Sequence, residues 1–323
     1  MDYTQTNTDE QQIVEQLEQL RQKARQKVRL AMLGGALAAL AVGAASVGLI
    51  SYEMRMGSSD LLTTIFGALI FTVGVGAVVF GVLWHLLVKR QYALFANQYK
   101  ERYVVSVAQT LPGIAKVHYQ LDGFTYDEVR NMAVVNCGTE SVFESEDLLQ
   151  GEIQGVRFAM ADVVTKRLRR RDRRQETDLL FNGVVLRFSQ ALPHNAANRG
   201  WVQVFQKELL STIKGWCAPT KYKADSEDFN KKFDIYCEET RHADAVLTAS
   251  MQERLLQLAQ ESKAQVAVAV YGDHLYVAVD TFSSMFDPKV NIPVAEQRQR
   301  LLEDLRPLEQ CAKLLLSSAG NRI

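Results

Sequence analysis

Two long apolar runs near the N-terminus constrain this chain more than any other feature. They extend from Leu30 to Ile50 and from Leu61 to Val88, and neither contains an aspartate, glutamate, lysine or arginine. A helix rises ~1.5 Å per residue, so each run is long enough to cross the ~30 Å hydrocarbon core of a bilayer. Both runs are therefore predicted to be transmembrane helices.

The basic residues around these runs predict how the hairpin is oriented. Five bases precede the first run, at Arg21, Lys23, Arg25, Lys27 and Arg29. Lys89 and Arg90 directly follow the second run, whereas the connection between the runs has only Arg55. Positively charged flanks remain in the cytoplasm. We therefore expect a multi-pass membrane protein with both termini in the cytoplasm. A cleaved signal peptide is not expected, because an acidic stretch precedes the first run.

Small residues recur on one face of each apolar run. The residues are Gly67, Gly74 and Gly81 in the second run and Gly35, Ala39 and Gly43 in the first. Small residues on a shared face allow two helix backbones to approach closely in lipid. We expect an antiparallel hairpin that packs through these glycine faces. A solute pathway is not expected, because the runs have few polar residues at mid-membrane depth.

The chain is expected to divide into four parts. The segment before the first run is amphipathic, with apolar residues at steps of three and four. Such a stripe either packs on the protein's own cytoplasmic part or pairs as a short coiled coil. The predicted parts are a cytoplasmic amphipathic N-terminal helix in residues 1–29, a two-helix transmembrane hairpin in 30–88, a helical connector in 89–111 and a cytoplasmic α+β domain in 112–323.

The strand signals of the cytoplasmic part predict antiparallel hairpins. Gln154-Gly155 and residues 271–274 are typical hairpin turns between alternating strands. Leu179–Ser189 and Trp201–Phe205 are predicted to form a further strand pair.

Two helices are expected near the C-terminus. Ser250 and Glu253 match the capping box at the start of a helix. A final helix is expected from about Val294 to Leu316. Pro307 is predicted to kink this helix or to divide it in two.

Chemistry-bearing motifs are missing from the sequence. It has no phosphate-binding GxxxxGK[ST], no GxGxxG, no HExxH and no GxSxG. The cysteines, at 137, 217, 237 and 311, lack the CxxC spacing of zinc sites, and Cys137 and Cys237 read as small hydrophobes on buried segments. The charged cluster from Glu238 to Asp244 is typical of an exposed loop or helix face. We therefore predict no catalytic, cofactor-binding or metal-binding residue, no cofactor, and no enzyme.

One basic run stands out in a chain whose 37 basic and 37 acidic residues balance. It consists of Lys166, Arg167, Arg169, Arg170, Arg171, Arg173 and Arg174, with Asp172 as the single acid. Its place between two predicted strands makes it a hairpin tip. Three interpretations are open: a solvated loop, a contact with anionic lipid headgroups, or nucleic acid. Nucleic acid is disfavoured, because no aromatic residues interleave with the bases.

Four short segments together resemble a known family. They begin at Phe143, Leu180, Asp228 and Leu247 and read Phe-Glu-Ser-Glu-Asp-Leu-Leu-Gln-Gly-Glu-Ile-Gln-Gly, Leu-Phe-Asn-Gly-Val-Val, Asp-Phe-Asn-Lys-Lys-Phe-Asp-Ile-Tyr and Leu-Thr-Ala-Ser-Met-Gln-Glu-Arg-Leu-Leu. The chain thereby resembles, over about residues 30–290, the bacterial domain-of-unknown-function family number 3137. The resemblance implies two membrane helices, a cytoplasmic α+β domain and a bacterial inner membrane. It implies no catalytic residue.

These observations lead to one expected function and one alternative. We expect a membrane-anchored binding or scaffold domain whose partners are the lipid bilayer and either further copies of the chain, as a homo-oligomer, or another envelope protein. The alternative is a membrane-tethered enzyme with a dispersed active site. A deep pocket of convergent titratable groups would favour the enzyme.

Overall fold

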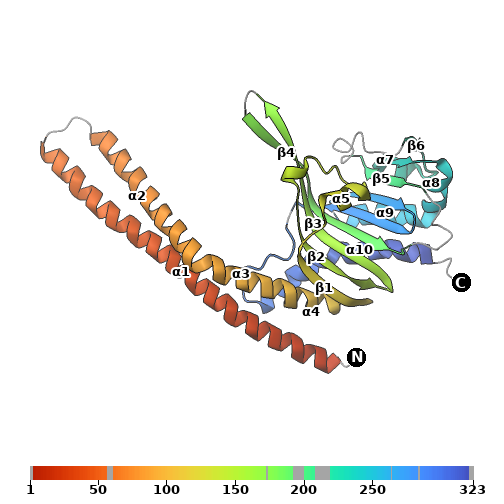
Figure 1. Ribbon diagram of the computed structural model, residues 1–323, viewed down its shortest axis with the longest axis horizontal. Helices are drawn as coiled ribbons and strands as arrows, with labels where there is room; N and C mark the ends of the chain where they lie inside the picture. Colours follow the sequence, from red (N-terminus) through yellow and green to blue (C-terminus); the bar gives the residue numbers. More distant parts are fainter. Residues whose placement is uncertain are drawn as a thin grey trace. The chain divides into compact units, whose positions relative to one another are not determined.

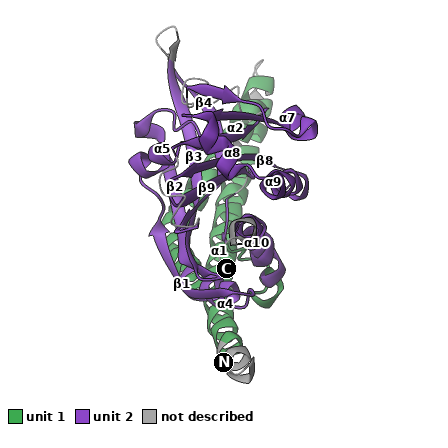
Figure 2. Ribbon diagram, turned by 90° about the vertical axis from the view of Figure 1, so that its right-hand side faces the viewer, with its two compact units in different colours: residues 1–99, 288–297 green, residues 100–287, 298–323 purple. Residues whose placement is uncertain are grey.

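The computed structural model describes residues 3–56, 61–171, 174–191, 200–207, 219–262, 264–282 and 284–319. The chain forms two compact units, coloured separately in Figure 2. The helical unit consists of Met1–Tyr99 and Pro288–Gln297, and the sheet unit consists of Lys100–Asp287 and Arg298–Ile323. The predicted α+β class is confirmed, since the N-terminal region is helical and the rest is built on an antiparallel sheet.

The helical unit is built on two long antiparallel helices (Figure 1). Its elements are α1 (Tyr3–Met56), α2 (Leu61–Leu83), the π-helix η1 (Trp84–Val88) and α3 (Lys89–Gln98). Two stretches, Glu10–Tyr52 and Leu62–Gln109, contain helix long and apolar enough to cross a membrane. Large apolar side chains cover the outward faces of both helices, and Leu40 and Ile70 are each 70% exposed.

The contact between α1 and α2 uses a different glycine of α2 from those predicted. A Cβ on Gly76 would lie 2.9 Å from the Ala39 Cβ, and one on Gly35 would lie 3.1 Å from the Gly76 carbonyl oxygen. Farther along, a Cβ on Gly43 would lie 3.6 Å from Thr72. On α1, Gly35 and Gly43 therefore face α2.

The predicted packing of Gly67, Gly74 and Gly81 is wrong. A Cβ on any of these three glycines would meet no described atom within 4 Å. The helix turns about 100° per residue, so Gly74 points about 200° away from the direction of Gly76. The seven-residue spacing did place the three glycines on one face, but that face is exposed.

The amphipathic stripe of α1 packs against its own chain. In the helical unit, α1 contacts α3, and the segment 288–297 is hydrogen-bonded to α1. Arg21 donates from Nη1 to the Val290 carbonyl at 2.6 Å, and Glu18 accepts from the Val294 backbone N–H at 3.1 Å. Glu18 and Arg21 also form an ion pair. Leu17 and Ala24 of the stripe are fully buried, as is Ala31 at the start of the first apolar run.

The described residues of the sheet unit form nine antiparallel strands in the order β1-β2-β3-β4-β9-β8-β5-β7-β6. Their bounds are β1 Ile114–Asp122, β2 Glu144–Ile153, β3 Val156–Arg171, β4 Arg174–Ser189, β5 Val202–Gln206, β6 Thr220–Tyr222, β7 Phe233–Cys237, β8 Gln265–Tyr271 and β9 His274–Asp280. The predicted turns after β2 and β8 are confirmed, and Gln154, Gly155 and Gly272 adopt the positive φ angles that such turns need.

Helices lie on both faces of this sheet. The described helical elements of the sheet unit are the π-helix η2 (Tyr99–Val104), α4 (Val105–Gln109), α5 (Tyr126–Met132), η3 (Glu140–Val142), α7 (Glu227–Lys232), α8 (Thr240–Val246), α9 (Ala249–Glu261) and α10 (Arg298–Ala319), whereas η5 (Ala295–Gln297) belongs to the helical unit. Figure 2 shows α5 on one side of the sheet and α9 with α10 on the other. We call these sides the α5 face and the α10 face.

Alternating side chains give each face its own apolar core. On the α10 face, neighbouring strands align a row of buried residues: Leu149, Met160, Leu186, Val277, Val268 and Val204. On the α5 face, small residues such as Ala161 and Ala278 pack against the region of Phe124 to Cys137. Both faces are buried over the middle of the sheet, which explains why several strands read as continuous apolar runs.

Two local predictions need correction, and one of the two alternatives for the final helix is excluded. The strand Val202–Gln206 does not pair with β4, because the hairpin of β8 and β9 lies between them. Helix α9 is capped by Thr248, whose hydroxyl accepts the Met251 N–H at 3.3 Å, so Ser250 belongs to the first turn and forms no capping box. Helix α10 is not divided, because Pro307 lies inside one continuous element.

Candidate functional site

The predicted basic run lies on a two-stranded ribbon that extends beyond the rest of the sheet (Figure 1). Pairing of β2 with β3 ends at Val164, and pairing of β9 with β4 begins at Val184. Between these points β3 and β4 pair with each other, up to Arg171 opposite Arg174. We call residues 166–171 and 174–178 the basic ribbon.

Acidic residues offset part of the charge of the basic ribbon. Lys166 pairs with Glu144 at 2.6 Å, and Arg169 pairs with Asp178 at 2.5 Å. The Arg169 side chain is 60% exposed, so this ion pair contributes little to stability. The backbone places Arg170 opposite Gln175, near the end of the ribbon. Arg173 lies outside the described residues, as do the side chains of Arg170, Arg171 and Arg174.

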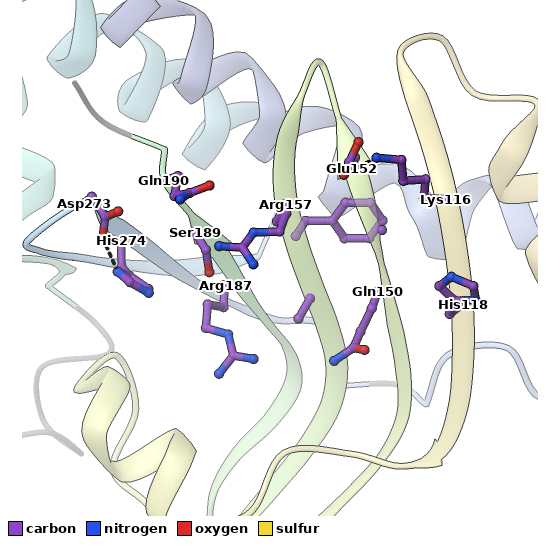
Figure 3. A pocket seen from close by; sticks show the side chains of 13 residues that line it. Lys116, His118, Gln150, Glu152, Arg157, Arg187, Ser189, Gln190, Asp273 and His274 are labelled. Carbon is purple, nitrogen blue, oxygen red and sulfur yellow. Dashed lines mark hydrogen bonds and ion pairs between the residues drawn. The ribbon is translucent and has the colours of Figure 1, made fainter. Parts of the chain in front are cut away.

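A second candidate site is a polar groove on the α5 face of the sheet, with a volume of about 480 Å³. Residues of β1 to β4 and of the turn between β8 and β9 line it (Figure 3). Strand register explains how it forms. Ala159 lies between Gln150 of β2 and Arg187 of β4, and Arg157 lies between Glu152 and Ser189. The groove therefore begins where the apolar residues of the α5 face give way to polar ones.

Arg187 is held in place from two sides. Its Nη1 atom donates to Glu128 Oε1 at 3.2 Å, and its guanidinium lies 5.3 Å from the centre of the Phe124 ring. Glu128 also accepts the backbone N–H of Thr125 at 2.9 Å, completing the capping box at the start of α5. Burial raises the pKa of Glu128, but hydrogen bonds from Thr125 and Arg187 outweigh it and lower this pKa below its usual range. Helix α5 thus fixes the position of the arginine.

The other charges of the groove differ in how they are paired. Lys116 pairs with Glu152 at 2.8 Å, and His274 Nδ1 lies 2.6 Å from Asp273 Oδ1. Arg157 is exposed, and within the described chain its side chain has no hydrogen bond or ion pair. Arg157 therefore leaves one guanidinium free for a ligand.

The charged cluster after β7 does not assemble a reactive site in the described structure. Arg241 pairs with Glu239 at 2.6 Å, and Tyr222 donates to Asp244 at 2.5 Å. His242 is buried, and its Nδ1 has no partner among the described atoms. These contacts tie the cluster to its own loop and to β6.

The described cysteines are buried thiols. Cys137, Cys237 and Cys311 are free and buried, as predicted for the first two, and Cys217 lies outside the described residues. Burial raises the pKa of Cys137 to about 12, so its nucleophilic thiolate is scarce at neutral pH. In the described part of the chain, no group of three or more metal-binding side chains comes together.

A cluster of charged residues is buried on the opposite, α10 side of the sheet unit. Lys100 lies 2.8 Å from Asp147 and 3.0 Å from Asp287. Nearby on β3, Asp162 Oδ2 accepts the Met285 N–H at 2.5 Å, and its Oδ1 has no partner among the described atoms. Burial raises the pKa of Asp162 to about 7. Sequence analysis could not find this cluster, because its members are far apart along the chain.

The comparisons with known proteins add one finding. No curated protein and no solved structure matches the chain. A family model described as "Protein of unknown function (DUF3137)" matches residues 180–316, from β4 to α10. The helices α1 and α2, and the family segment read at Phe143, lie outside this match. Over residues 180–316, the predicted resemblance to this family is therefore confirmed.

Proposed function

We propose that the chain is a bacterial inner-membrane protein that acts by binding, with α1 and α2 as its multi-pass anchor and both termini in the cytoplasm. The exposed apolar faces of the two helices support this anchor, because side chains such as Leu40 and Ile70 are favourable in lipid and unfavourable in water. The basic flanks support the orientation. The family resemblance supports a bacterial source.

The observation that carries the proposed binding function is the basic ribbon. It is a two-stranded extension with seven bases and three acids between Lys166 and Asp178. Anionic headgroups attract such a segment with on the order of 1 kcal/mol per base close to the surface. The ribbon is therefore proposed to bind the anionic leaflet in which the protein is anchored. A binding surface beside the membrane also suits a scaffold for further copies of the chain or for another envelope protein.

Trypsin protection of the full chain tests the lipid contact. The protein is reconstituted in vesicles of neutral phosphatidylcholine, with or without anionic phosphatidylglycerol, and cleavage after Arg167 is compared with cleavage after the exposed Lys231. We expect the anionic lipid to slow cleavage after Arg167 at least about fivefold in 0.1 M salt. The protection should disappear in 1 M salt, because the Debye length falls from ~10 Å to ~3 Å.

Two sets of substitutions control this experiment. The variant Arg169→Gln, Arg170→Gln, Arg171→Gln keeps the cleavage site at Arg167 but should lose the protection. The matched set Lys221→Gln, Lys223→Gln, Arg241→Gln removes three exposed bases around the edge strand β6, outside the basic ribbon, and should keep the protection. Equal cleavage of the wild-type ribbon in both lipids refutes the contact, and protection by added RNA alone points to nucleic acid.

The alternative is a membrane-tethered enzyme. The polar groove is the feature such an enzyme would use, but its charged groups are arranged as ion pairs around Arg157 and Arg187. No hydrogen bond between a hydroxyl or thiol nucleophile and a histidine is present among the described groove residues. This arrangement favours binding over catalysis.

A further inference from the structure

We propose that the polar groove binds a small molecule through a phosphate monoester group. The group would lie over Ala159, between the side chains of Arg157 and Arg187. This site is separate from the basic ribbon and does not depend on a lipid contact.

Strand register brings the donors of this site together. Ser189 lies directly opposite Arg157, and Arg187 lies opposite Ala159, so the two arginines are diagonal neighbours on adjacent strands. Diagonal neighbours lie about 7–8 Å apart, within reach of long side chains. Gln150 adds an amide from β2 on the other side of Ala159. Figure 3 shows these four polar side chains at the groove on three neighbouring strands.

The small side chain of Ala159 makes room for a ligand. A longer residue at this position would fill the space between the two guanidinium groups. Ala159 is 4% exposed, so it forms the floor of the groove. The groove volume of about 480 Å³ is in the usual range for small-molecule sites and leaves space for a sugar-sized remainder beside the phosphate.

The pairing pattern favours an anion with several oxygens. Arg187 is oriented by Glu128 and keeps further N–H donors, while Arg157 has all its donors available within the described chain. Guanidinium groups bind carboxylates and phosphates in a bidentate manner. Two guanidinium groups, one amide and one hydroxyl offer more donors than the two oxygens of a carboxylate need. A phosphate monoester, with three terminal oxygens and up to two negative charges, can accept hydrogen bonds from more of these donors.

The test measures binding to the full chain in a maltoside detergent, which has no phosphate of its own. Ribose 5-phosphate is the probe, and line broadening of its ³¹P resonance reports binding. We expect broadening with the wild-type protein and at least a tenfold weaker affinity with Arg157→Gln. Arg157 is exposed and has no described partner, so this change should leave the fold intact, which circular dichroism checks.

A matched variant and a competitor complete the design. Arg306→Gln removes an exposed arginine from α10 and should bind the probe like the wild type. Inorganic phosphate should displace the probe, and acetate at the same ionic strength should not. The proposal is overturned if the wild type does not broaden the resonance, if Arg157→Gln binds equally well, or if acetate competes as well as phosphate.

Discussion

Replacing Asp162 with asparagine removes a titrating group from the buried α10 face of the sheet. Asp162 is only 5% exposed, and it is flanked across the strands by Glu146 and Val184. Burial is the main cause that raises its pKa to about 7. The charges of Asp147 and Glu146 raise this pKa further, and the Met285 N–H and Lys100 lower it. Asparagine keeps an oxygen that can accept the same N–H.

The sign of the effect follows from linkage between protonation and folding. The folded state holds the Asp162 proton more tightly than the unfolded chain, so protonation stabilises the fold at low pH. This stabilisation is lost as the pH rises through the folded-state pKa of about 7. If Asp162 has the ordinary aspartate pKa in the unfolded chain, the free energy of unfolding falls by about 3 kcal/mol between pH 5 and pH 8. The asparagine variant lacks this loss.

Urea unfolding of the full chain in detergent, followed by circular dichroism at both pH values, measures the difference. Other groups titrate in both proteins, so the quantity to compare is the stability of the wild type minus that of the variant. This difference should fall by about 3 kcal/mol from pH 5 to pH 8. Parallel pH profiles for wild type and Asp162→Asn would refute the reasoning.

Three further expectations concern the helical unit. Gly76→Leu should lower the unfolding temperature in detergent, because even a Cβ there would lie 2.9 Å from Ala39, whereas Gly74→Leu on the exposed face should change it little. The opposite ranking of the two variants would contradict the helix contact. Arg21→Ala should destabilise the unit by about 1–3 kcal/mol, because it leaves Glu18 without its ion pair and removes a donor to Val290. In the same variant, amide exchange should become faster in the segment 288–297, and unchanged exchange there would count against the role of this arginine.

Local signals were sufficient for the parts of the fold that depend on neighbouring residues. The apolar runs and the turn at Gln154-Gly155 are each specified by a few adjacent residues. Strand β1 was missed, because it is an edge strand in which only Val117 is buried and no alternation is visible. The predicted partner strand of Val202–Gln206 was wrong, because the apolar pattern of a strand does not specify which neighbour it pairs with.

The two candidate sites also differ in whether their residues are neighbours in the sequence. The basic ribbon was visible in the sequence because its charges are consecutive. The polar groove was not, because Arg157 and Arg187 are thirty residues apart and become neighbours only through the register of β3 and β4. One signal was available in the sequence. At alternating positions, polar residues replace apolar ones: Arg157 in β3, and Arg187 and Ser189 in β4.

Cysteine accessibility in intact bacterial spheroplasts tests the central claim of a membrane anchor with a cytoplasmic binding domain most directly. One variant carries Ser58→Cys in the connection between the apolar runs, and the other carries Gln175→Cys in the basic ribbon, where the side chain is exposed. The unsubstituted protein measures background from its native cysteines. With an impermeant thiol reagent, Ser58→Cys should react before lysis and Gln175→Cys only after lysis. Reaction of Gln175→Cys in intact spheroplasts would contradict the account.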